Sequence, residues 1–237
     1  MKGYIMSSDT RWTLGFLIIV GICVAAFLLA PMFCYNIKQP APRTVCHHNM
    51  KNIALALLAY QNSHSTLPPA YTVDESGKPL HSWRVLILPM LSEEKLYKEI
   101  RLDEPWDSEH NRQFHTQMPR VFRCPAGKSP GHGLCYYSVV VGEETLFTGS
   151  QGVNKDQITD NPAATILLVE RKTPVCWMDP TQEITFADLS GLGSGHSANI
   201  TAFADGTVCA IPQNIAPETL RALLTKADGE RVNVDDL

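Results

Sequence analysis

Positive charge is scarce in this sequence of 237 residues. Its 20 Lys and Arg residues are outnumbered by 24 Asp and Glu residues, and the formal net charge is −4. A nucleic-acid-binding domain needs clustered Lys and Arg residues and a high isoelectric point. The charge balance therefore excludes nucleic acid as a partner.

Complete catalytic motifs are also missing. Ser194 does not lie in a G-x-S-x-G motif, because Leu192 and His196 stand where the two glycines belong. The run Gly191-Leu192-Gly193 lacks the strand and the spacing of a dinucleotide-binding loop. We therefore expect a protein that is not an enzyme and that needs no cofactor and no catalytic metal.

A second long hydrophobic run is absent as well. The one uncharged apolar stretch of membrane-spanning length covers residues 13–33. At 1.5 Å per residue a helix of this length crosses the ~30 Å hydrocarbon core of a bilayer. A cleaved signal peptide has a shorter core and ends on small residues, whereas this run ends with Pro31, Met32 and Phe33. We expect an uncleaved transmembrane helix.

This helix divides the chain into four expected parts: a short tail (1–12), the transmembrane helix (13–33), a Pro-containing linker (34–45) and an α+β domain (46–237). Lys and Arg residues stand on both sides of the helix, so charge does not choose the orientation. The short tail favours a cytoplasmic N-terminus. We therefore expect a single-pass protein of the inner membrane that contacts lipid through residues 13–33 and has an extracytoplasmic C-terminal domain.

Five cysteines lie in the domain, an odd number that forbids a complete disulfide framework. They are Cys46, Cys124, Cys135, Cys176 and Cys209. Cys124 and Cys135 flank a turn-rich loop that can close with little strain, and they are the pair that we expect to be bridged. Free thiols are one alternative. Zinc bound with His132 is another, although C-x7-H-x2-C lacks the two-residue spacing of zinc knuckles.

Hydrophobic periodicity predicts a helix over residues 46–61. Met50, Ile53, Leu57 and Tyr60 recur at helical spacing, and this places them on one face. Further expected elements are helices over 82–91, 92–97, 110–118 and 217–226 and strands over 136–141, 165–169, 175–178 and 200–204. Asp205-Gly206 between two apolar runs predicts a β-hairpin. Because helices precede strands, the fold class is α+β, with an amphipathic helix packed on a sheet.

Several short blocks resemble one bacterial family. They are Cys46-His47-His48-Asn49-Met50-Lys51-Asn52-Ile53, Ser82-Trp83-Arg84-Val85, Asp103-Glu104-Pro105-Trp106-Asp107 with Asn111, Phe122-Arg123-Cys124-Pro125 and Phe203-Ala204-Asp205-Gly206. In order and spacing the blocks resemble the prepilin-like family that carries domain of unknown function 1559. Its members look like type IV pilins or type II secretion pseudopilins. The resemblance implies an N-terminal helix that lies half in the membrane and half on an antiparallel sheet, and it implies no reaction.

The same resemblance points to two further motifs. Gly15-Phe16 is similar to the junction cut by the prepilin leader peptidase, but Val20 stands where family members usually have glutamate. We therefore expect little or no cleavage after Gly15. His196, followed by Asp205 and Gly206, approximates the C-terminal signature of the family.

The sequence thus predicts a pseudopilin-like structural, assembly or interaction component of the cell envelope or of a secretion apparatus, with protein partners. The alternative is an envelope ligand-binding module or hydrolase centred on His196 and Asp205. We favour the first, because the glycines around His196 suit a loop and Asp205 suits a hairpin corner.

Overall fold

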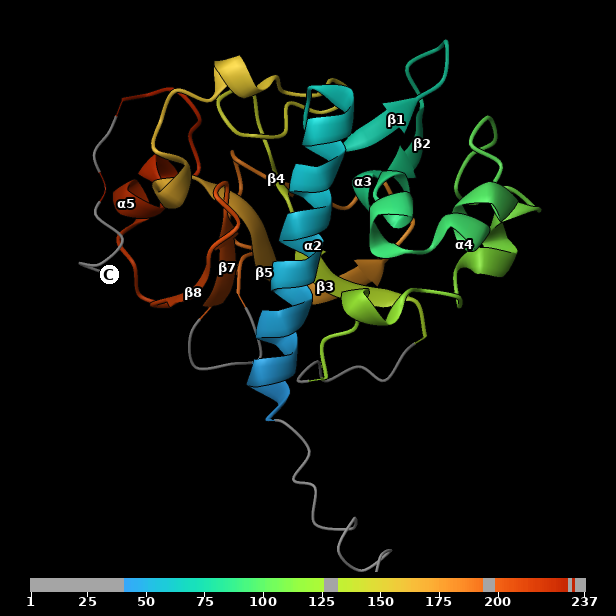
Figure 1. Ribbon diagram of the computed structural model, residues 1–237, viewed down its shortest axis with the longest axis horizontal. Helices are drawn as coiled ribbons and strands as arrows, with labels where there is room; N and C mark the ends of the chain where they lie inside the picture. The colour runs from blue at the N-terminus through green and yellow to red at the C-terminus, as the bar shows by residue number, and fades with distance from the viewer. Residues whose placement is uncertain (1–40, 126–131, 194–198, 230–231, 233–237) are drawn as a thin grey trace, which may run out of the picture. The chain divides into compact units, whose positions relative to one another are not determined.

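The computed structural model describes residues 41–125, 132–193, 199–229 and 232 (Figure 1). These residues belong to one compact unit, Ala41–Leu237, and its architecture is α+β, as the sequence predicts. Within the described ranges, no helix is both long enough and apolar enough to cross a membrane. The expected transmembrane helix 13–33, the Gly15-Phe16 junction and Val20 lie outside these ranges.

The long helix α2 spans Pro42–His64. It starts four residues earlier than predicted, so 42–45 belong to the helix and not to the linker that we expected over 34–45. Pro42 is the first helical residue, where a missing N–H costs nothing and the fixed φ angle suits a helix. The expected apolar stripe is confirmed, because the buried side chains include Met50, Ile53 and Leu57.

Four antiparallel strands form the main sheet in the order β3-β5-β7-β8. Their bounds are β3 Leu134–Ser138, β5 Ile166–Cys176, β7 Asn199–Phe203 and β8 Val208–Ile211. The two strands expected over 165–169 and 175–178 are one strand, β5. Its pairing with β3 shifts register between Cys135 and Tyr137, and a bulge of this kind accommodates Pro174 within the strand.

The hairpin at Asp205-Gly206 is confirmed. It joins β7 to β8, with Ala202 opposite Val208. Gly206 has a φ of +84°, a conformation that glycine adopts without strain. The Lys51 ammonium group of α2 donates a hydrogen bond to the Gly206 carbonyl oxygen at 2.6 Å. This contact holds the turn against the helix.

The sheet has a different core on each face. Ile200 and Ala202 of β7 pack in the same cluster as Ile53 and Leu57 of α2, and we call this cluster the α2-side core. Phe203 of β7 belongs to a second cluster, which we call the α5-side core. The remaining members of that cluster include Val169, Ile211, Leu223 and Leu224. Alternate residues of a strand point to opposite faces, so a single strand supplies both cores.

Short elements surround this frame (Figure 1). They are β1 Tyr71–Val73, β2 Pro79–Ser82, α3 Trp83–Leu86, η1 Leu88–Leu91, α4 Glu94–Glu99, η2 Asn111–Phe114, η3 Arg120–Phe122, β4 Val140–Val141, η4 Lys155–Gln157, η5 Pro162–Ala164, β6 Ile184–Thr185 and α5 Pro217–Ala222. Ser82 caps α3, whereas Ser92 has a left-handed backbone and does not cap α4. The helices predicted over 110–118 and 217–226 are shorter than expected.

Candidate functional site

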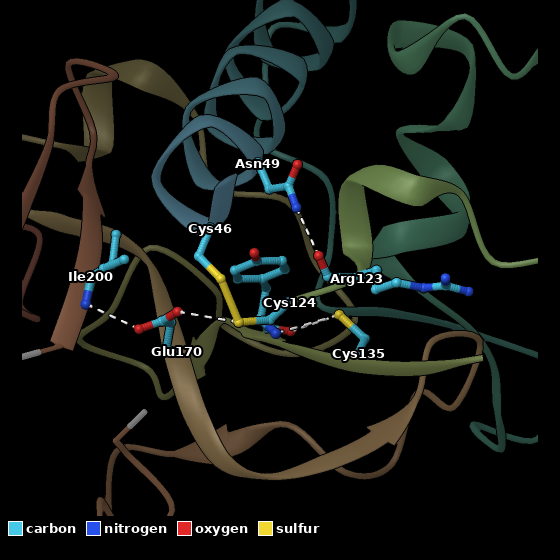
Figure 2. The surroundings of a disulfide bond; sticks show 8 residues. Cys46, Asn49, Arg123, Cys124, Cys135, Glu170 and Ile200 are labelled. Carbon is cyan, nitrogen blue, oxygen red and sulfur yellow. Dashed lines mark hydrogen bonds between the residues drawn. A yellow bond between two sulfur atoms is a disulfide. The ribbon is translucent and has the colours of Figure 1, made fainter. Parts of the chain in front are cut away.

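A disulfide bond ties the first turns of α2 to the segment that follows η3. It joins Cys46 to Cys124, whose Cα atoms are 5.4 Å apart and which are separated by 78 residues of sequence (Figure 2). The expected Cys124–Cys135 bridge is therefore wrong, and Cys135 is a buried free thiol in β3. The closure of a short loop suggested that pair, but the packing of α2 brings a more distant cysteine against Cys124.

The zinc alternative also receives no support from the arrangement of side chains. Among the described residues, the ligand atoms that lie within 4.8 Å of one another belong to Cys46, Cys124 and Glu170. Two of these three residues are already bonded to each other. His132 is exposed and is not part of this group.

Glu170 of β5 is buried beside the disulfide bond. One carboxylate oxygen lies 4.0 Å from Cys124 Sγ, and the other accepts a hydrogen bond from the Ile200 backbone N–H at 3.2 Å (Figure 2). Sequence reasoning did not identify this residue. Its only signal was an acidic residue at the end of the apolar run Ile166–Val169.

A buried ion pair lies next to the α2-side core. Arg84 of α3 pairs with Glu183, and both side chains are almost completely covered. Arg84 also donates to the Tyr137 carbonyl oxygen at 2.6 Å, and Glu183 accepts from the Ser138 hydroxyl group at 2.7 Å. Arg84 belongs to one of the sequence blocks that carry the family resemblance, and here it joins α3 to the sheet.

Cys135 is close to this ion pair, but its environment does not suit a nucleophile. Burial raises the pKa of the Cys135 thiol, although the nearby Arg84 guanidinium group favours the thiolate. A reactive cysteine needs a lowered pKa and access to solvent. Cys135 is therefore a packing residue of β3.

The other family blocks also act through packing. Trp83 meets Phe122 edge to face at 6.2 Å between ring centroids, and Phe122 stacks on Trp177 at the same distance. The buried Asn111 side chain accepts from the Arg101 N–H at 3.0 Å and donates to the Arg101 carbonyl oxygen at 2.9 Å. These contacts hold the loops after α4 on the body of the domain.

The alternative site centred on His196 and Asp205 has one described member. Asp205 is exposed, and its carboxylate accepts from the backbone N–H and the hydroxyl group of Thr207, both at 2.7 Å. This geometry supports a role as a hairpin corner. His196 lies outside the described residues.

A cavity of about 310 Å³ lies on the face of the main sheet opposite α2, and we call it the α5-side cavity. Its lining comes from β5, β7, β8, the segment 189–192 and the segment that leads into α5. Apolar walls are supplied by Val169, Leu189, Leu192, Ile211, Ile215 and Leu220, and polar groups by Glu170, Lys172, Asn199, Thr201, Gln213 and Arg221. A concave apolar surface with a few converging polar groups is typical of a small-molecule site.

Two polar atoms of this lining have no partner. Thr201 is 1% exposed, and neither its hydroxyl oxygen nor the Asn199 carboxamide oxygen forms a hydrogen bond in the described part of the chain. Sequence reasoning missed both residues. The available signal was the alternation of Asn199 and Thr201 with the apolar Ile200 and Ala202, which is typical of a strand with one polar face.

Comparison with known proteins gives a family and no closer relative. Searches of curated proteins and of solved structures found no match. The family described as "Protein of unknown function (DUF1559)" matches residues 36–165, more than half of the chain. The matched region contains α2, the disulfide bond, the family blocks around Trp83 and Asn111, and strand β3. The chain therefore belongs to the DUF1559 family, which the order of its sequence blocks predicted.

Proposed function

We propose that the chain is a pseudopilin-like structural or assembly component of the bacterial cell envelope or of a secretion apparatus. The observation that carries this proposal is the arrangement of α2, a helix of 23 residues packed on an antiparallel sheet. This is the architecture that the resemblance to pilin-like proteins implies. In this proposal the domain acts through protein contacts and carries out no reaction.

The proposal also places the domain outside the cytoplasm, held in the inner membrane by residues 13–33. The Cys46–Cys124 bond supports an oxidising compartment, because disulfide bonds are rare in cytosolic proteins. Membrane fractionation tests the anchor. The wild-type chain should remain in the membrane, and Ile19→Lys combined with Ala25→Lys should release it, because central charges oppose insertion. Recovery of the wild-type chain in a soluble wash contradicts the anchor.

Processing is a separate part of the proposal. We expect an intact N-terminus, because Val20 and the few basic residues before Gly15 depart from the prepilin pattern. Intact-mass measurement of the purified protein tests this expectation. A chain that starts at Phe16 would instead favour a processed filament subunit.

Photo-crosslinking in intact cells tests the assembly role. Leu55 of α2 is 49% exposed and Val73 of the β1–β2 hairpin is 36% exposed, so a crosslinking residue at either position should leave the fold intact. The proposal expects discrete adducts from the α2 position, identified by mass spectrometry as copies of this chain or as envelope proteins, and fewer from the hairpin position. The absence of discrete adducts at both positions contradicts it.

The competing hydrolase function is tested with His196→Ala and Asp205→Ala. The assembly proposal expects no turnover of ester, peptide or glycoside substrates by the wild-type protein. Asp205→Ala should cost only the modest stability of a turn residue. Turnover that disappears in His196→Ala at unchanged thermal stability would replace the assembly proposal with an enzymatic one.

A further inference from the structure

Asn199 and Thr201 line the α5-side cavity, and each has a covered polar atom without a partner in the described part of the chain. The two residues are two positions apart on β7, and both therefore face the same side of the sheet. Native proteins leave few buried polar groups without a partner, and each exception calls for an explanation. A bound molecule with a hydrogen-bonding group would supply the missing partner, after a change of side-chain rotamer turns these covered atoms toward it.

Two positively charged side chains, Lys172 and Arg221, lie among the residues that line the cavity. Lys172 and Arg221 are both exposed, and neither forms an ion pair within the described residues. The Lys172 ammonium group donates to the Ser190 carbonyl oxygen at 2.9 Å, and the Arg221 guanidinium group lies over the Phe186 ring at 4.9 Å. Both cations are thus held in place without being neutralised.

Glu170 also borders the cavity, but among the described side chains it forms no ion pair with Lys172 or Arg221. One of its carboxylate oxygens points toward Cys124 Sγ, and the other accepts a hydrogen bond from the Ile200 N–H (Figure 2). The exposed edge of the cavity therefore favours an anionic group, and the covered β7 wall favours an uncharged polar group.

The other walls of the cavity are largely aliphatic. Leu189 and Leu192 come from one segment, Ile211 from β8, and Ile215 and Leu220 from the segment around α5. A cavity of about 310 Å³ has the size of a typical small-molecule site.

We propose that the α5-side cavity binds a small organic carboxylate with an apolar body and a hydroxyl group at its far end. The carboxylate pairs with Lys172 and Arg221, the apolar body packs against the leucine and isoleucine side chains, and the hydroxyl group bonds to Asn199 and Thr201. This inference goes beyond the assembly role, because it concerns the opposite face of the sheet from α2 and requires no anchor. Binding is reversible, and no covalent step takes place.

Three probes of similar size separate the three interactions. They are 3-(4-hydroxyphenyl)propionate, 3-phenylpropionate, which lacks the hydroxyl group, and tyramine, which replaces the carboxylate with a cation. Each is titrated calorimetrically into the full-length chain in a nonionic detergent, and titrations into detergent alone are subtracted. We expect one saturable site for the hydroxylated acid, weaker binding of 3-phenylpropionate and no binding of tyramine.

Two sets of variants locate the site. Lys172→Gln combined with Arg221→Gln should weaken the hydroxylated acid at least about tenfold, because both charges that face the carboxylate are lost. Thr201→Val should remove the advantage of the hydroxylated acid over 3-phenylpropionate. Thr165→Val is the matched control, because Thr165 is equally buried, lies outside the cavity and already donates to the Asn161 carbonyl oxygen. It should leave the ratio of the two affinities unchanged.

Thermal unfolding of every variant confirms that the fold is retained. The absence of saturable binding by either acid overturns the proposal, and so does binding of tyramine as tight as that of the acids. A ratio of affinities that is the same in Thr201→Val and in the wild-type chain also overturns it. All of these results leave the crosslinking and membrane tests of the assembly role unaffected.

Discussion

The two faces of the main sheet differ in what covers them. On the α2 side, Ile53 and Leu57 of the helix and Ala202 of the sheet are fully buried, and a disulfide bond fastens the helix to the body of the domain. Within the described residues, the opposite face is covered by several short segments, among them α5 and residues 189–192, and the α5-side cavity lies there. The α2 side holds the long helix of the domain, and the α5 side holds the cavity that we propose as a ligand site.

The sequence of the family supports the same distinction. The matched region, residues 36–165, contains α2, the disulfide bond and the contact of Trp83 with Phe122, but it ends before β7, β8 and α5. All the residues that line the cavity, from Val169 to Arg221, therefore lie beyond the family match. We expect substitutions on the two faces to have different consequences, and the following experiments test this from the largest effect to the smallest.

The largest effect should come from α2. Ile53→Ala combined with Leu57→Ala removes two fully buried side chains, and each such truncation typically costs about 2–5 kcal/mol. The sum approaches the total stability of an ordinary domain, ~5–15 kcal/mol. Chemical denaturation measures the loss. Leu55→Ala on the exposed side of the same helix is the control and should change stability by less than about 0.5 kcal/mol. Equal losses of stability in the double variant and in Leu55→Ala would contradict the assignment of the buried face of α2.

Loss of the disulfide bond should rank second. Cys46→Ala combined with Cys124→Ala frees a loop with a sequence separation of 78 residues, and chain entropy predicts a cost of roughly 4 kcal/mol. The control is Cys135→Ala together with a peptide map recorded without reduction. The map should recover a Cys46–Cys124 peptide and a free Cys135. A Cys124–Cys135 peptide would contradict the structure.

Removal of one partner of the buried ion pair should come third. Glu183→Gln leaves the Arg84 guanidinium group buried without its counter-charge, and such changes typically cost about 3–5 kcal/mol. The value should fall toward the lower limit, because the Tyr137 carbonyl oxygen still accepts from Arg84. Glu104→Gln, in the exposed pair with Arg101, is the matched control and should have little effect. A similar response of the two variants would show that Arg84 is solvated.

The smallest effect should come from the cavity itself. Thr201→Val removes a hydroxyl group that has no partner among the described residues, so stability should stay unchanged or rise by up to about 1 kcal/mol. Thr165→Val removes a bonded hydroxyl group at the same degree of burial and should cost about 1 kcal/mol. Urea denaturation of both variants measures the difference. A larger loss for Thr201→Val would mean that its hydroxyl group already has a partner in the empty protein.

Local patterns predicted much of the fold. The helical spacing of Met50, Ile53 and Leu57 identified the buried face of α2, and Asp205-Gly206 identified the β7–β8 hairpin. These features depend on interactions among residues that are close in sequence. The same reasoning assigned Pro42 to a linker and divided β5 into two strands. A local pattern does not show that a proline can be accommodated by the residues packed around it.

Most of the α5-side cavity could not be predicted from the sequence. The polar alternation of Asn199 and Thr201 is visible in the sequence. Only the tertiary structure shows that they share a cavity with Val169, Ile211 and Leu220 and that no described residue bonds to one polar atom of each. An unpaired buried group is a property of everything packed around it, and its own sequence neighbours do not determine it.

The sequence by itself therefore determined the fold class, the main helix, the hairpin and the family, because periodicity, turn chemistry and the order of short blocks are local properties. Only the tertiary structure decided which cysteines meet and which polar groups remain unpaired. Cys46 and Cys124 are 78 residues apart, and they are joined because α2 packs across the sheet and brings its first turns to the segment after η3. Long-range packing supplies that proximity, and no local pattern records it.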